Sequence, residues 1–121
     1  EFAPHEASAA PSLQGRSAAT WRPTLRPPGN ARTPPPAGGS LEVTTTQLLP
    51  GWLRRNGVPY SGDTKLTEHF DRFAGPDGAE WLVVTSIVED PQYLNGRFIT
   101  SSHFRRETDR SKWNPQPCKP I

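Results

Sequence analysis

Apolar and polar residues follow a period of two along the last two-thirds of the chain, and this pattern predicts β-strands. The clearest runs are 41–48, 65–73, 80–88 and 97–104, which are rich in β-branched and aromatic residues and are bounded by Pro, Gly, Asn or Asp. A short strand is also expected over 52–55. We therefore expect a mainly β protein, built as a small antiparallel meander or curled sheet.

The run 80–88 differs from its neighbours because both of its faces are largely apolar. The two alternating sets are Trp81, Val83, Thr85 and Ile87 on one side and Leu82, Val84, Ser86 and Val88 on the other. A strand with one solvated face alternates apolar and polar residues instead. The pattern predicts that 80–88 lies between 65–73 and 97–104 in the meander, with both of its faces covered. A folded-over sheet, a curled barrel-like closure, the Pro-rich segment before residue 41 or a partner chain could supply the second cover.

The segment between 80–88 and 97–104 reads Glu-Asp-Pro-Gln-Tyr-Leu-Asn-Gly. Asp90-Pro91 is typical of a turn start, and Asn95-Gly96 is typical of a step with positive φ. We expect Asp90 to cap or start this turn and Tyr93 to pack inward as its anchor.

Residues 1–40 differ from the rest in composition. They hold eight of the 15 prolines, and hydrophobic residues make up only 32% of the whole chain, against about 45–50% in a typical domain. So little apolar mass predicts no folded core. We expect 1–40 to form a long extended Pro-rich arm, polyproline-like in part and ending in a flexible hinge, and 41–121 to form the β-domain.

The net charge of +2 comes from the arm, since the charges of 41–121 balance. The arm's basic residues are arginines, spaced four to six residues apart among prolines. Nucleic-acid binding favours a denser basic face with stacking aromatics, so no nucleic-acid partner is predicted. In the domain, the carboxylates near one another in sequence are Glu68, Asp71, Glu89 and Asp90. They lie among four arginines, which predicts cross-strand ion pairs and not acid–base catalysis: Arg72, Arg97, Arg105 and Arg106.

Cys118 is the only cysteine, so no internal disulfide and no Cys-based metal motif can form. It is expected to be free or paired with another chain. No apolar run is long enough to span a membrane. The Ala/Ser/Pro-rich start is typical of a mature exported protein and favours a periplasmic or extracellular location; the alternative is that Glu1-Phe2 is a cloning remnant.

The candidate chemistry is sparse. His69, Asp71 and His103 are a ligand set that a curled sheet could gather, but such combinations also arise by chance, and we predict no metal site and no cofactor. Ser101, Ser102 and His103 follow one another on a strand and alternate in direction, so they do not form a nucleophile–base pair. No catalytic residue is predicted, and the chain is not expected to be an enzyme.

Several stretches resemble small exported bacterial proteins of unknown function, over about residues 41–118. The matching stretches are LPGWLRRNGVPYS, LTEHFDRF, WLVVTSIVEDPQYL, FITSSHFRRE and SKWNPQPC. The shared features are a strand, a D-P-x-x-L loop, a further strand and a tail with Trp, Pro and Cys. The resemblance implies a small β-rich exported domain and transfers no catalytic residue, and it leaves out the arm.

We therefore expect a non-enzymatic accessory subunit that docks through its arm on other protein chains of a larger assembly, such as a membrane-bound one that faces the periplasm. The predicted partner-binding residues are Phe2, Leu13, Arg16, Trp21, Arg22, Leu25, Arg26, Arg32 and Tyr93. Recognition of an extended Pro-containing segment by an apolar groove is a known mode. The alternative is a β-domain that holds a small apolar molecule with Trp81, Phe98 and Phe104.

Overall fold

The protein is mainly β and its sheets are antiparallel, as predicted. The computed structural model describes residues 10–23, 39–54 and 57–117, and no helix forms among them. The strands are β1 (Arg16–Pro23), β2 (Gly39–Thr46), β3 (Gly51–Arg54), β4 (Val58–Tyr60), β5 (Lys65–Ala74), β6 (Glu80–Glu89) and β7 (Phe98–Arg105).

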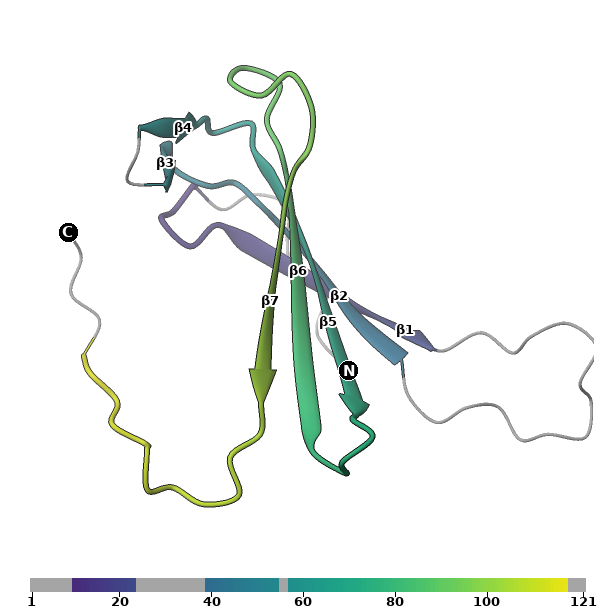
Figure 1. Ribbon diagram of the computed structural model, residues 1–121. Coiled ribbons are helices and arrows are strands. Elements are labelled where there is room, and N and C mark those ends of the chain that lie inside the picture. The colour runs from purple at the N-terminus through teal and green to yellow at the C-terminus, as the bar shows by residue number, and fades with distance from the viewer. Residues whose placement is uncertain (1–9, 24–38, 55–56, 118–121) are drawn as a thin grey trace, which may run out of the picture.

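Five of these strands form one sheet in the order β1-β2-β5-β6-β7, and β3 and β4 form a separate hairpin. Figure 1 shows the sheet strongly twisted, with the hairpin and the β6–β7 loop at the same end. β5, β6 and β7 follow one another as a meander, with β6 between its neighbours, which confirms the predicted order.

The β5–β6 turn has the backbone conformation that its sequence predicts, whereas the β6–β7 loop does not. The β5–β6 turn uses Gly78 at φ 74°, where a side chain would be strained, and the Ala79 amide donates to the Asp77 carboxylate at 3.1 Å. The positive φ expected at Asn95-Gly96 is absent, since neither residue adopts one. The β6–β7 loop instead closes from its start, where the Leu94 amide donates to the Asp90 carbonyl at 3.1 Å.

β1 lies within the predicted arm, yet it forms an edge of the main sheet. It pairs with β2 from Arg16↔Thr46 to Pro23↔Gly39. The Ser17 and Thr45 hydroxyls are 2.7 Å apart. The strand consists mostly of small and polar residues, and Trp21 is its one large apolar side chain. The sequence therefore shows no clear apolar alternation here, and the strand is hard to predict from it.

No element among the described residues covers both faces of β6, and cover by the arm or by a partner chain stays a prediction. Val88 is the only apolar side chain that these residues bury, at 5% exposure, while Leu82 in the same strand is 36% exposed. No second layer packs across the sheet in the described part of the chain, because the only other element is the short β3–β4 hairpin.

Candidate interaction surface

The alternation of side chains divides the main sheet into two faces with different chemistry. Directly opposed residues in neighbouring strands share a face. We define the apolar face by Ala19, Trp21, Leu41, Val43, Leu66, Phe70, Leu82, Val84, Val88, Phe98 and Phe104, which the strand registers place on one side. The other side, the polar face, carries most of the Thr, His and charged side chains of the strands.

The apolar face has a continuous row across four strands. Trp21 is opposite Leu41, Leu41 is opposite Phe70, and Phe70 is opposite Val84. The row ends at Trp21, which is 58% exposed. Apolar surface in such a contiguous arrangement is typical of a protein interaction site.

One end of the apolar face is covered by the β3–β4 hairpin. The Arg54 guanidinium lies over the Phe98 ring, 5.2 Å from its centroid, in a cation–π contact. Val88 is opposite Phe98 in the register and is buried at this end. Cover therefore stops near Val88 and leaves the central row half-exposed.

A buried carboxylate fixes the loops at the same end. Asp90 is 3% exposed and accepts hydrogen bonds from the Ser61 amide at 2.5 Å and from the Thr64 hydroxyl at 2.7 Å. It also accepts from the amides of Gln92 at 2.8 Å and Tyr93 at 3.1 Å. This confirms the predicted turn start at Asp90.

The charge of Asp90 is held by these donors. Burial by itself raises the pKa of a carboxyl, and the hydrogen bonds from Ser61, Thr64 and the two loop amides outweigh it and hold the pKa of Asp90 well below its usual range. Every carboxylate oxygen contact runs to a neighbouring loop or to its own turn. The arrangement is a structural clamp between two loops.

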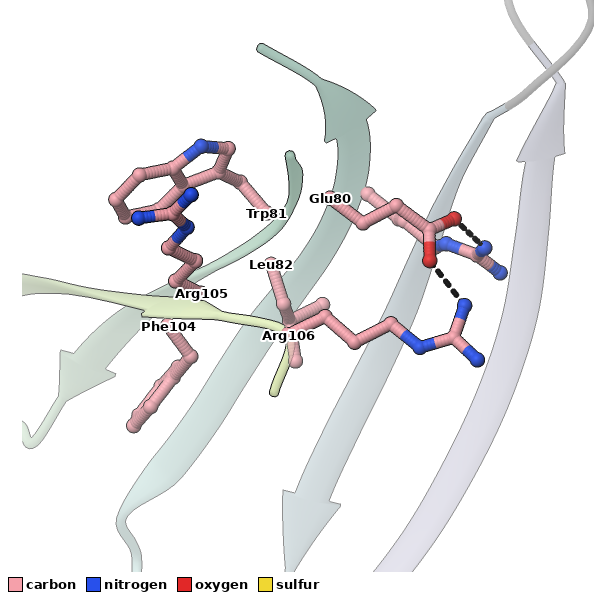
Figure 2. A pocket seen from close by; sticks show the side chains of 7 residues that line it. Glu80, Trp81, Leu82, Phe104, Arg105 and Arg106 are labelled. Carbon is pink, nitrogen blue, oxygen red and sulfur yellow. Dashed lines mark hydrogen bonds and ion pairs between the residues drawn. The ribbon is translucent and has the colours of Figure 1, made fainter. Parts of the chain in front are cut away.

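The opposite end of the sheet carries a charged cluster and an open hollow. The Glu80 carboxylate pairs with both Arg72 and Arg106, and Figure 2 shows it reaching the Arg106 guanidinium. Hydrogen bonds from Arg106, which has the larger effect, and from Arg72 hold the pKa of Glu80 below its usual range. The sequence predicts ion pairs between arginines and nearby carboxylates, and Arg97–Glu89 at 3.1 Å is one of them. Glu80 was not among the carboxylates expected to pair, and Lys65–Glu89 at 3.3 Å is a further pair between β5 and β6.

The hollow at this end has a volume of about 430 Å³, and its walls include Trp81, Leu82 and Phe104. Figure 2 shows Trp81 and Phe104 on opposite sides of the β7 ribbon. Phe98 begins β7 and Phe104 nearly ends it, so Phe98 does not line this hollow. The three aromatic residues expected to hold a small apolar molecule are therefore not gathered in one cavity.

The structure separates the predicted partner-binding residues. Trp21 lies on the apolar face, whereas Arg16 and Arg22 alternate with it onto the polar face. Arg22 already pairs with Glu42 at 3.0 Å. Leu13 precedes β1 and is 70% exposed.

Tyr93 is 55% exposed, so the expectation that it packs inward is wrong. Its backbone amide, bonded to Asp90, anchors the loop in place of its ring. The remaining predicted residues lie outside the described part of the chain: Phe2, Leu25, Arg26 and Arg32.

The described residues show neither a metal cluster nor a membrane-spanning helix. No three His, Cys, Asp or Glu side chains among 10–23, 39–54 and 57–117 come close enough to hold a metal ion. Within the same ranges, no helix has the length and apolar character that crossing a membrane requires.

Sequence reasoning missed the residues that now matter most on this surface. Leu41 and Phe70 lie in strands that read as ordinary half-buried elements, and their shared row becomes visible only through the register. Ser61 and Thr64 are unremarkable in the sequence and gain a role through Asp90. The only sequence signal for Asp90 was the Asp90-Pro91 step, which is typical of a turn start.

No family model matches the chain, and neither the curated proteins nor the solved structures contain a match to it. The resemblance to small exported bacterial proteins therefore stays a prediction.

Proposed function

We propose that this chain is a non-enzymatic, exported structural subunit that docks on another protein chain through the apolar face of its sheet. The observation that carries the proposal is the half-exposed row formed by Trp21, Leu41, Phe70 and Val84. An apolar sheet face normally packs on a second layer. A partner chain that supplies this layer would bury the row.

The charges on the apolar face indicate the chemistry of the partner. Glu68 lies among its apolar residues, next to the central row, and its nearest hydrogen-bond partner is the Ser86 hydroxyl at 3.3 Å. Glu80, by contrast, is balanced by two arginines. A carboxylate that becomes buried needs a positive partner. We propose a partner with an apolar surface that places one basic side chain opposite Glu68.

The predicted arm contributes to this proposal through β1. Trp21 is the described residue of the predicted binding set that lies on the apolar face, and aromatic side chains are enriched at interaction hot spots. Export to the periplasm or the exterior, and the absence of enzymatic activity, remain part of the proposal and rest on the sequence. The alternative, an apolar small-molecule carrier, has less support because Trp81 and Phe104 project from opposite faces.

Photo-crosslinking from adjacent residues tests the proposal. A benzophenone amino acid replaces either Phe70 on the apolar face or His69, its neighbour on the polar face, in the full chain inside the producing cell. We expect a discrete protein adduct from position 70 and little from 69. Glu68→Lys should weaken the adduct from position 70, whereas equal labelling from both positions would overturn the proposal.

A further inference from the structure

Among the residues that the structure describes, none gives the outer edge of β7 the usual protection of an edge strand. β7 is last in the strand order and pairs with β6 without a break in register from Val88↔Phe98 to Trp81↔Arg105. Proteins usually protect such edges with Pro, Lys, a bulge or a short strand. β7 has eight residues, with no proline, no lysine and no bulge.

The sequence of β7 is nearly palindromic about Ser101. Residues 98–104 read Phe-Ile-Thr-Ser-Ser-His-Phe, so two of the three residue pairs at equal distances from Ser101 are similar in type, and only Ile99 and His103 differ. A two-fold axis through Ser101, perpendicular to the sheet, would set Phe98 opposite Phe104 of a second copy and Thr100 opposite Ser102 of that copy. Ile99 would face His103 of the second copy.

This register keeps each side chain on its own face. Phe98 and Phe104 both belong to the apolar face, and Ile99 and His103 both belong to the polar face. Opposed side chains in a sheet must share a face, so a pairing centred on one residue satisfies the rule and a pairing centred between two residues violates it. Aromatic pairs and Thr–Ser pairs across strands are stabilising.

The charges at the ends of β7 do not oppose this pairing. Arg97 would face Arg105 of the second copy, but Arg97 pairs with Glu89 at 3.1 Å and Arg105 pairs with Asp77 at 3.4 Å. Each arginine therefore brings its own counter-charge to the junction. No other pair of like charges faces across the two-fold axis between residues 98 and 104.

We propose that two copies of this chain join through antiparallel pairing of their β7 strands about Ser101, which extends the sheet to ten strands. Phe98 and Phe104 then continue the apolar face from one copy into the next. This contact uses the strand edge and not the apolar face, so it goes beyond the docking function proposed above and does not depend on it. One strand pair buries less than a standard interface, so we expect a reversible dimer.

Disulfide trapping tests the contact in the full-length chain with Cys118→Ser as background. Ser101→Cys would place two cysteines directly opposite each other, where the Cα separation in an antiparallel pair is about 4.5–5.5 Å and suits a disulfide. Ser111→Cys is the matched control, because Ser111 is an exposed serine beyond β7. We expect the dimer disulfide to form at least about tenfold faster at position 101.

Two further variants test the register. Thr100→Cys and Ser102→Cys should crosslink slowly when each is alone, because each faces the other residue and not itself. An equimolar mixture of the two should crosslink rapidly. The proposal is overturned if Ser101→Cys reacts no faster than Ser111→Cys, or if either single variant reacts as fast as the mixture.

A charge at the axis provides the complementary measurement by sedimentation. Ser101→Lys sets two like charges directly opposite each other and should raise the dimer dissociation constant about fivefold, whereas Ser101→Thr should leave it within about twofold. Ser101 is exposed, so the lysine is tolerated by the monomer fold. A wild-type chain that stays monomeric at all concentrations would also overturn the proposal.

Discussion

A single carboxylate, Asp90, determines how the loops at one end of the sheet are arranged. It follows β6 directly and joins the β6–β7 turn to the segment that connects β4 to β5. Its main donors, Ser61 and Thr64, are each 3% exposed. Loss of the carboxylate would leave these groups buried without a partner, which is more costly than the loss of an exposed hydrogen bond.

We expect Asp90→Asn to destabilise the protein by about 2–3 kcal/mol, since the amide cannot accept all of these hydrogen bonds. Chemical denaturation at neutral pH measures the change. Asp109→Asn is the control, because Asp109 is exposed and caps only the Ser111 amide, at 2.8 Å. Equal effects of the two substitutions would contradict the role given to Asp90.

The same residue should make stability depend on acid pH. The pKa of Asp90 is lowered on folding, so its contribution is fully present above the unfolded value of about 3.9 and is lost as the pH falls below it toward the folded value. Unfolding free energies measured between neutral and acid pH should fall more steeply for the wild type than for Asp90→Asn. Parallel curves would show that Asp90 does not carry this dependence.

The sequence predicted the residue that starts this turn but not its partners. Asp90-Pro91 indicates a turn through the preferences of two adjacent residues, and such local preferences can be recognised in a single sequence. Ser61 and Thr64 are nearly thirty positions away and reach Asp90 only because β5 and β6 run antiparallel. Tyr93 was misjudged because an apolar ring was assumed to be the anchor, whereas backbone amides bonded to Asp90 hold the loop.

At the scale of elements, the strands with strong alternation were predictable and β1 was not. β5, β6 and β7 combine β-branched or aromatic residues with clear boundaries, and their order follows from short connections. β1 is Arg-Ser-Ala-Ala-Thr-Trp-Arg-Pro, with one large apolar side chain and proline-rich flanks. Such a strand is specified by the edge of β2 that it pairs with, which lies outside its own sequence.

The pairing of β1 yields a prediction about truncation. Deletion of residues 1–23 removes the Ser17–Thr45 and Arg22–Glu42 contacts and turns β2 into an edge strand. We expect a loss on the order of 2 kcal/mol in unfolding free energy. The backbone hydrogen bonds of the β1–β2 pairing and the Ser17–Thr45 bond are lost, and the entropy cost of ordering β1 offsets part of this loss. Thermal or chemical denaturation of the truncated chain measures this.

Leu13→Ala is the control for the truncation. Leu13 is 70% exposed and precedes β1, so this change should have little effect. A truncated chain as stable as the full one would mean that β1 adds nothing to the fold. In that case the segment before β2 would be available to bind partners, as expected for the extended arm that the composition of 1–40 predicts.

At the scale of the whole molecule, the described residues form a five-stranded twisted sheet with one half-exposed apolar face, and a separate two-stranded hairpin. Five strands with a hydrophobic face and a small hairpin over one end can fold, but Val88 alone is buried among their apolar side chains. Small domains have little stability to spare. Under the two proposals above, association is the route by which this architecture would gain both stability and a role.

The last prediction follows from mass action. If β7 pairs with a second copy, folding is linked to dimerisation, and the midpoint of thermal unfolding rises with protein concentration. We expect a rise of about 5 °C over a hundredfold increase in concentration. Ser101→Lys should flatten this dependence without lowering the midpoint at the lowest concentration, because it weakens the contact at an exposed position of the strand. Scanning calorimetry of the two proteins across the same concentrations measures both effects. A wild-type midpoint that does not move with concentration would show that the sheet folds to its full stability as a single copy.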